Sequence, residues 1–492
     1  MSGLRPFIVH TLLSLGFYTA AMGQPRSVLQ GSIELGSVLS SAPTTPFWLR
    51  TNQFGIVPNQ APVGLLQASV SKAYRTPDST QRRKFDWAFR VNPVVTYDKE
   101  NKTQVLLPEA NLSVRFGALE LYGGRRREVI GLGDTTLSSG FYAVSGNSLP
   151  IPKLQLSTVG FAPLHFTHDF LAVNAGFAHG WFNAPYIQGA RLHQKYLYLR
   201  FGKPASLVKV YAGGNHQVQW AGHSDALKQR PDIADNGYLP SDWYFYKYVV
   251  FSYTPKNWNT ISGYTSFDSY RVGNSVGSFD FGVELNLKGK KLLAYYQHPY
   301  EDVSGILFLN MPDGLYGLSC AMTPAPSNSF RLTRLTLEFL TTKDQSGPSF
   351  YIPGSSYQGA DNYYNHGQYW EGWSYFSRTI GTPFIAPRQD FDPSYELHNG
   401  YFFSNNRVNM WYVGVQAMYR RATFLLRTSY SQNYGTFNEP FVPSPSQFSA
   451  LLTAQCPITR LPNTFLIAKA AIDNGGLYTK AVGGYIGLRK SW

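Results

Sequence analysis

The chain ends in Val482-Gly483-Gly484-Tyr485-Ile486-Gly487-Leu488-Arg489-Lys490-Ser491-Trp492, and this stretch decides the fold. Counted back in twos from Trp492, one face is mostly apolar, whereas the other face is mostly polar or small. A strand between lipid and a wet lumen needs this alternation, and bacterial outer-membrane barrels usually end in such a strand with a terminal aromatic residue. Lys490 breaks the apolar face, but a lysine near the membrane edge can extend its ammonium group to the headgroups. The stretch predicts the closing strand of a transmembrane β-barrel, although the last strand of a soluble sandwich has a similar pattern.

The first 23 residues have the features of a secretory signal peptide. One charge, Arg5, precedes an apolar stretch that begins at Phe7, and small residues stand where signal peptidase reads the chain. The apolar stretch is too short and too interrupted to span a membrane as a mature helix. We therefore expect residues 1–23 to be removed on export and residues 24–492 to form a single outer-membrane barrel domain.

The composition also indicates a barrel. Aromatic residues make up 16% of the 492 residues, and charged residues make up only 15%, which is low for a soluble surface. Barrels place aromatic residues in two girdles at the membrane interfaces, and no apolar run here is long enough for a transmembrane helix. The formal net charge of +14 suits an anionic environment, such as lipopolysaccharide phosphates or an acidic polysaccharide. Nucleic acid is a poor alternative, because the chain has no compact basic motif. Cys320 and Cys456 lie far apart and could pair, but two thiols make no disulfide framework.

Apolar and polar residues alternate with a period of two along most of the chain. In the clearest example, the face that runs from Trp411 to Tyr419 is aromatic at both ends and aliphatic between, as a strand that crosses two aromatic girdles requires. Charges on such strands fall mostly on the opposite face, which in a barrel is the lumen. The pattern predicts an all-β fold, a transmembrane antiparallel β-barrel of roughly eighteen strands. The predicted strands are 65–74, 85–96, 111–122, 169–178, 195–201, 207–212, 244–253, 259–267, 279–288, 291–297, 305–309, 315–321, 331–341, 411–420, 424–430, 448–455, 464–472 and the C-terminal stretch.

Three segments are too long and too polar for turns: residues 123–163, 216–243 and 347–406. Long connections in a compact protein are usually functional, and in barrels the long ones are normally extracellular. We therefore expect the ligand-binding residues in these loops.

The third segment contains Tyr363-Tyr364-Asn365-His366-Gly367-Gln368-Tyr369-Trp370-Glu371-Gly372-Trp373-Ser374-Tyr375, in which aromatic residues stand among amides, an acid and an imidazole. Aromatic faces stack on the C–H face of a pyranose, while amide and acid groups hydrogen-bond its hydroxyls. The second segment begins with a similar mixture around Trp220. An interfacial girdle or a packed plug would have the same composition. The predicted polysaccharide-binding residues are Asn215, His216, Gln219, Trp220, Tyr364, Asn365, His366, Tyr369, Trp370, Trp373 and Arg407.

The chain shows no motif of a known catalytic or metal site. It has no G-x-S-x-G elbow, no H-E-x-x-H sequence and no P-loop, and we expect no metal and no cofactor. His216 and His223 have no carboxylate or thiol at ligand spacing beside them. Asp361, Glu371 and Asp390 are acids in an aromatic loop, so glycoside hydrolysis stays open as an alternative. We expect a protein that is not an enzyme.

Several further blocks follow one another in the chain. They are Gly131-Leu-Gly-Asp134-Thr-Thr-Leu-Ser-Ser-Gly140 with Pro150-Ile-Pro152, Leu192-His-Gln-Lys-Tyr-Leu-Tyr-Leu-Arg200, Gly214-Asn-His-Gln217 with Gln219-Trp220, Tyr363-Tyr-Asn-His366 with Gly372-Trp-Ser374, Gly381-Thr-Pro-Phe384 and Asn405-Asn-Arg407. In their joint order they resemble the blocks of the Wzi-type capsule-assembly proteins, in the version found in Bacteroidota. The resemblance covers the chain from about Phe47 to the C-terminus. It implies an outer-membrane β-barrel with a helical element at one mouth, which binds exported capsular polysaccharide and attaches it at the cell surface without catalysis.

We therefore expect an outer-membrane protein that binds exported capsular or related exopolysaccharide and helps to attach or assemble it at the cell surface. Its expected partners are this polysaccharide, outer-membrane lipids and lipopolysaccharide, and the barrel assembly machinery, but not nucleic acid. A diffusion porin or glycan channel is the first alternative and differs in having an open lumen. An outer-membrane hydrolase is the second alternative and needs a nucleophile–base or paired-carboxylate geometry.

Overall fold

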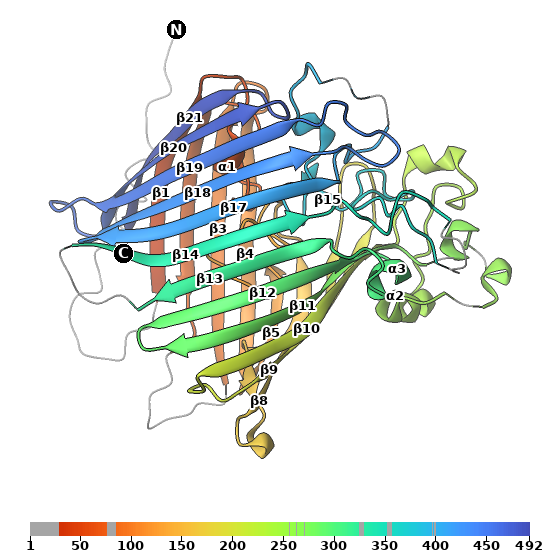
Figure 1. Ribbon diagram of the computed structural model, residues 1–492, viewed down its shortest axis with the longest axis horizontal. Helices are drawn as coiled ribbons and strands as arrows, with labels where there is room; N and C mark the ends of the chain where they lie inside the picture. The colour runs from red at the N-terminus through yellow and green to blue at the C-terminus, as the bar shows by residue number, and fades with distance from the viewer. Residues whose placement is uncertain are drawn as a thin grey trace, which may run out of the picture.

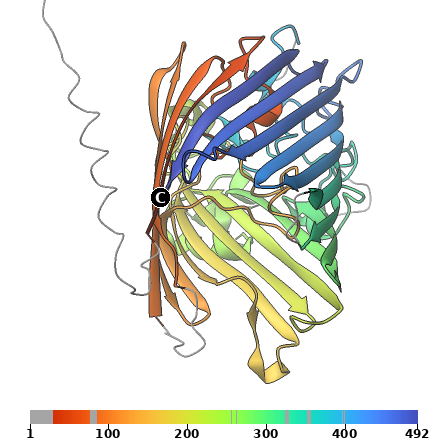
Figure 2. The same cartoon turned by 90° about the vertical axis from the view of Figure 1, so that its left-hand side faces the viewer.

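The computed structural model describes residues 29–75, 85–254, 256–261, 263–269, 271–323, 329–351, 357–395, 397 and 400–492. The predicted signal peptide, residues 1–23, lies outside these ranges. The described chain forms one closed antiparallel β-barrel, seen from two sides in Figures 1 and 2. Its sheet has 19 strands, of which the two-residue β7 continues the line of β6 along β8. Eighteen strand positions therefore close the ring, which confirms the predicted fold class.

Each wall strand pairs with its neighbours in the sequence, so the topology is an up-and-down meander. The wall strands are β1 (Leu29–Ser40), β2 (Val63–Lys72), β3 (Phe85–Asp98), β4 (Lys102–Phe116), β5 (Leu119–Arg125), β6 (Lys153–Thr158), β7 (Ala162–Pro163), β8 (Leu171–Trp181), β9 (Arg191–Phe201), β10 (Val208–Trp220), β11 (Asn274–Leu287), β12 (Lys290–Tyr300), β13 (Gly314–Met322), β14 (Phe330–Thr341), β17 (Val408–Tyr419), β18 (Ala422–Asn433), β19 (Ser446–Pro457), β20 (Thr464–Gly475) and β21 (Ala481–Ser491).

The other elements are short and lie mostly in the connections. A small hairpin comprises β15 (Ser374–Tyr375) and β16 (Arg378–Thr379). The α-helices are α1 (Phe47–Arg50), α2 (Tyr246–Phe251) and α3 (Val303–Ile306). The 3-10 helices are η2 (His165–Thr167), η3 (Asp225–Gln229), η4 (Trp243–Phe245), η5 (Trp258–Thr260), η6 (Phe267–Ser269) and η7 (Arg388–Asp390). No helix in the described ranges is both long enough and apolar enough to cross a bilayer.

The ring closes between its first and last strands. β1 pairs with β21 in antiparallel register. Beyond that ladder, Trp492 donates its N–H to the Gly31 carbonyl over 3.0 Å and accepts from the Gly31 N–H over 3.1 Å. The indole of Trp492 lies so close to Gly31 that a β-carbon there would meet the ring at 2.3 Å. The C-terminal residue is thus part of the closing seam.

The two ends of the barrel differ in their connections. The turns from β4 to β5 and from β11 to β12 are only two residues long, and the C-terminus lies at the same end, on the left of Figure 1. The longest connections, residues 221–273 and 342–407, leave from the opposite end together with α2, α3 and β15. Outer-membrane barrels have short periplasmic turns and long extracellular loops. By this rule the loop end faces the outside of the cell.

Side chains alternate between the outer wall and the lumen. On β21 the side chains of Val482, Ile486 and Leu488 are exposed, whereas the Tyr485 hydroxyl donates a hydrogen bond of 2.5 Å to Glu34 on β1. This arrangement is the one that the C-terminal sequence predicts. Cys320 on β13 and Cys456 on β19 are both free thiols.

Three predicted strands are wrong. Residues 244–253 fall in η4 and α2, the described residues of 259–267 overlap η5 and η6 and include no strand, and residues 305–309 overlap α3. In the first case, Phe245, Tyr248 and Val249 have helical spacing and pack against the outer side of β10. In the third case, the Asp302 carboxylate accepts the Gly305 N–H over 3.3 Å and caps the helix.

β1 and β6 are absent from the predicted strands, and the predicted strand 111–122 covers parts of both β4 and β5. The errors cancel in the strand count. Glycine and serine occupy much of β1, which weakens its apolar period, and β6 is short. Hydrogen bonding to strands on both sides fixes these segments as strands, and the sequence of one segment does not show its neighbours.

Candidate functional site

Two connections fold back into the loop end of the barrel and fill it. Residues 126–152 follow β5, and residues 361–386 lie between β14 and β17. The Trp373 indole N–H donates to the Ala143 carbonyl over 2.7 Å, and the Ser145 N–H donates to the Ile380 carbonyl over 2.8 Å. Buried aromatic and aliphatic side chains of both connections pack against each other and against the wall. We call these two connections the plug.

Buried polar groups hold the first part of the plug against the wall. Asp280 on β11 accepts the Leu132 N–H over 2.8 Å, and Glu338 on β14 accepts the Ser139 N–H over 2.7 Å. Asp134 in turn accepts hydrogen bonds from two hydroxyls and one guanidinium group of β13 and β14. The sequence block 131–140, on which the family resemblance partly rests, is therefore the anchor of the plug.

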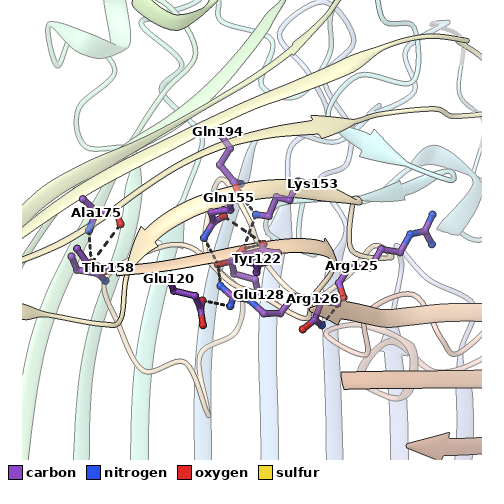
Figure 3. Close-up of polar contacts among 12 residues, drawn as sticks. Glu120, Tyr122, Arg125, Arg126, Glu128, Lys153, Gln155, Thr158, Ala175 and Gln194 are labelled. Carbon is purple, nitrogen blue, oxygen red and sulfur yellow. Dashed lines mark hydrogen bonds and ion pairs between the residues drawn. The ribbon is translucent and has the colours of Figure 1, made fainter. Parts of the chain in front are cut away.

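An ionic network ties both ends of residues 126–152 to the wall, with Glu128 at its centre (Figure 3). The Arg126 guanidinium lies 2.5 Å from Glu120 and 3.3 Å from Glu128, and the Lys153 ammonium lies 2.6 Å from Glu128. Burial acts to raise the pKa of Glu128, but Lys153 and Arg126 outweigh it and hold this pKa at about 2. Arg126 also lies 3.7 Å above the centre of the Tyr122 ring. Because these charges neutralise one another, the network positions the plug rather than offering a charge to a ligand.

The first group of predicted binding residues lies on a strand, which corrects the predicted loop boundary. Asn215, His216, Gln219 and Trp220 all belong to β10, and all are buried. Asn215 and Gln219 donate to tyrosine hydroxyls over 2.9 and 2.7 Å. His216 contacts Ser252, just after α2, over 2.8 Å, and Trp220 belongs to the apolar cluster beneath α2. The sequence was misleading because amides that line a lumen have the composition of a polar loop.

The second group lies in and around the plug. Its buried or half-buried members are Tyr364, Asn365, His366, Tyr369, Trp373 and Arg407. Trp370 differs, because 50% of its surface is exposed while its edge packs against Tyr186. The structure thus separates Trp370 from side chains that the plug encloses. A role of these residues in polysaccharide binding stays a prediction.

A cavity opens beside the plug at the loop end. It has a volume of about 1120 Å³ and lies between the β1–β2 connection, the β3–β4 hairpin and the β15–β16 hairpin. Its lining includes the guanidinium groups of Arg50, Arg125 and Arg378, the carboxylates of Glu100, Asp390 and Asp473, the amides of Asn59, Gln60, Asn101, Gln104 and Gln389, and the rings of Tyr375, Phe376 and Tyr478. We call it the loop-end pocket.

Two of the three guanidinium groups in the loop-end pocket have no ion pair. Arg50 pairs with Asp390 at 2.5 Å. Arg125 donates to the Tyr375 hydroxyl over 3.4 Å, and Arg378 donates to a backbone carbonyl of the β1–β2 connection over 2.9 Å. In the described parts of the chain, neither lies within ion-pair distance of a carboxylate. Burial lowers the pKa of Arg378 to about 10. The Asp390 carboxylate acts in the opposite direction but does not pair with Arg378, so an anionic ligand could still form an ion pair with this guanidinium group.

These groups together match the chemistry of an acidic sugar. Guanidinium groups bind carboxylates and phosphates in bidentate fashion, amides hydrogen-bond hydroxyls, and aromatic rings offer faces for stacking. The pocket as a whole could not be predicted from the sequence, because its residues come from separate segments of the chain. The basic run 125–127 was the one feature of the sequence that pointed to the pocket. Arg125 lines the pocket, whereas Arg126 is engaged in the ionic network.

Comparisons with known proteins bear on the fold. No family model matches the sequence, and no curated protein matches it. The structure is similar to that of Wzi from Escherichia coli, described as an outer-membrane protein involved in group 1 capsule assembly and as a carbohydrate-binding β-barrel. The identity is 13% and the TM-score 0.56, over 93% of this chain and 83% of that one. OccD3 and OprD of Pseudomonas aeruginosa are each 9% identical, with TM-scores of 0.43 and 0.42, over 94% of this chain and 90% and 94% of theirs. The likeness to Wzi shows that this chain has the fold of an outer-membrane β-barrel.

Proposed function

We propose that this protein binds an exported acidic polysaccharide at the outer face of the outer membrane and helps to attach or assemble it at the cell surface. The loop-end pocket carries the proposal, because Arg125 and Arg378 line it without a carboxylate partner in the described ranges. A uronate carboxylate or a sugar phosphate could form the direct ion pairs that Arg125 and Arg378 lack. The carbohydrate binding ascribed to Wzi, whose fold this chain shares, supports the same proposal.

The plug supports binding over diffusion. A porin needs a continuous aqueous path, whereas here the rings of Trp48, Tyr364, Trp373 and Phe403 are buried at the loop end. Closely packed interiors leave few voids larger than a water molecule. A protein that holds a polymer at the surface has no need of an open lumen.

The loop acids support binding without catalysis. Asp361 accepts from Ser346 over 2.8 Å, and Glu371 accepts from Ser377 over 3.2 Å. Asp390 is paired with Arg50. A glycosidase needs two carboxyl groups on either side of one glycosidic bond. Asp361 lies beside Asp302, and the Ser304 hydroxyl contacts both carboxylates, whereas Glu371 and Asp390 are each engaged by separate partners.

Equilibrium binding to the purified barrel tests the proposal. A short polyuronate is titrated onto the detergent-solubilised protein, with a neutral oligosaccharide as the comparison ligand. The variant Arg125→Gln/Arg378→Gln should bind the polyuronate at least about tenfold more weakly, since a hydrogen bond to a charged group contributes ~1.5–3 kcal/mol. Arg230→Gln is the matched control, because Arg230 pairs with Asp232 in an exposed loop away from the pocket. The proposal would be contradicted if the double variant bound the polyuronate as tightly as the wild type does. It would also be contradicted if the wild type bound the neutral oligosaccharide as tightly as the polyuronate.

A further inference from the structure

One strand of the wall has an unpaired edge at the loop end. β4 pairs with β3 from residue 102 to residue 116 except at a register shift at residues 107–108, but it pairs with β5 only over residues 110–116. The reason is that β5 ends at Arg125, after which the chain enters the plug. β6 begins level with the end of β5, at the pair Lys153–Gly124, and so does not replace it. Residues 102–109 therefore have no strand beside them on that side in the described ranges.

The unpaired edge lies at the level of the membrane. On the hairpin that carries it, Trp87 is exposed toward the short-turn end and Tyr97, with 63% of its surface exposed, stands near the loop end. Exposed aromatic residues at both ends of a strand mark the two membrane interfaces. Val105, with 74% of its surface exposed, and Leu107 lie on the outer wall between these levels. At ~3.3 Å per residue the unpaired edge runs for roughly 25 Å along the strand, beside the outer leaflet.

Backbone polar groups cannot face hydrocarbon without a partner. Open sheet edges at membrane depth are tolerated only where they are buried in protein or line a water-filled cavity. The loop-end pocket is such a cavity, since the four consecutive residues 104–107 of β4 all line it. Successive side chains of a strand point to opposite faces. A lining by all four residues therefore places the pocket along the edge itself, so that the pocket opens sideways between β4 and the end of β5.

We propose that this opening is a lateral window through which the anionic head of a glycolipid, anchored by its acyl chains in the outer leaflet, reaches Arg125 and Arg378. The inference rests on the acidic-glycan pocket proposed above and adds the way in which the ligand is held. The two guanidinium groups supply the charge that the head requires, and Gln104 at the window offers an amide to its hydroxyls. The exposed side chains of Val105 and Leu107 offer an apolar surface to the acyl chains.

Binding of one glycan with and without its acyl chains tests the window. The probes are a lipooligosaccharide with phosphorylated lipid A and the same molecule after alkaline removal of its acyl chains. Their affinities are measured by native mass spectrometry on the full barrel in detergent. The wild type should bind the acylated form at least about tenfold more tightly, because each buried methylene group adds to the hydrophobic contribution.

Variants that narrow the window should remove this difference. Val105→Trp and Gln104→Trp each place a bulky side chain at the opening, and each should bind both forms with similar affinity. Leu112→Trp is the matched control, because Leu112 is exposed on the same strand where β4 is paired with β5. It should keep the preference of the wild type. A shift in mobility on boiling, seen in detergent gels, shows which variants are folded. If one of the two window variants does not fold, the other one is used for the test.

The outcomes separate the window from the pocket. The window would be overturned if the wild type bound the acylated and deacylated forms with equal affinity. It would also be overturned if both window variants folded and still preferred the acylated form. In either case something other than a glycolipid would cover the unpaired edge. Absence of binding of either form would overturn the window and would also count against the acidic-glycan pocket. Binding of the deacylated form alone would overturn the window while supporting the pocket.

Discussion

At the scale of single residues, burial separates side chains that hold the plug from side chains that can meet a ligand. Trp370 and Trp373 stand three positions apart in one aromatic loop, yet 50% of Trp370 is exposed and only 1% of Trp373. The Trp373 indole donates to the Ala143 carbonyl inside the plug. The sequence cannot distinguish the two residues, because sugar sites and packed plugs favour the same aromatic composition.

Alanine substitutions should separate these two roles. Trp373→Ala removes a buried ring and a hydrogen bond, so it should destabilise the protein by about 3–5 kcal/mol, seen as a lower melting temperature and less folded barrel. Trp370→Ala should leave the melting temperature nearly unchanged and lower polysaccharide binding. Equal destabilisation by both substitutions would contradict the distinction between an exposed Trp370 and a Trp373 that holds the plug together.

A buried acid gives a second prediction at this scale. Burial, together with the neighbouring Asp302, raises the pKa of Asp361 to about 8. In an unfolded chain this pKa is ~3.9, so between the two values the native protein holds a proton that the unfolded chain has released. Stability should therefore fall as the pH rises from about 4 to about 8. Asp361→Asn should reduce that slope in melting temperature, whereas Asp232→Asn, in an exposed loop, should retain it. Glu301 and Asp313, with pKa values of about 7 and about 6 raised chiefly by burial, should keep part of the slope.

At the scale of elements, the sequence predicts wall strands well where one face meets lipid. The C-terminal stretch and the strand that carries Trp411 both have the predicted outward face. Prediction fails where an element packs on the outer wall, as α2 does, or where a loop folds into the lumen, as the plug does. In these places both faces of a segment contact other parts of the protein, so the alternation of apolar and polar residues no longer indicates which face is buried. The loop-end pocket escaped prediction for the related reason that separate segments meet there.

The closing seam gives the prediction for this scale. Deletion of Trp492 removes two backbone hydrogen bonds to Gly31 and the ring that covers this glycine. The truncated chain should still be exported but should yield much less folded barrel, because the first and last strands must pair to satisfy each other's edges. Trp492→Phe keeps a terminal aromatic ring and should restore most of the folded barrel. Normal levels of folded barrel in the deletion variant would show that the C-terminus is merely a strand end.

At the scale of the whole molecule, a closed barrel with a packed plug combines a rigid wall with an outer surface for ligands. Apart from the unpaired edge of β4, the wall satisfies its backbone internally, so the folded protein should resist detergent until boiled and shift on gels. Reconstituted in planar bilayers, it should show no unitary conductance, because the plug fills the loop end. Steady porin-like conductance of the wild type would contradict the packed plug and favour a channel.

The most direct test of the central claim is made on cells. Cell-bound acidic polysaccharide is measured per folded barrel in cells that produce the wild type, Arg125→Gln/Arg378→Gln or the control Arg230→Gln. We expect the double variant to release polysaccharide into the medium and to have a lower ratio, although polymer multivalency reduces the loss below the change in single-site affinity. The control should retain the wild-type ratio. An unchanged ratio in the double variant would contradict the claim that the loop-end pocket holds the polysaccharide.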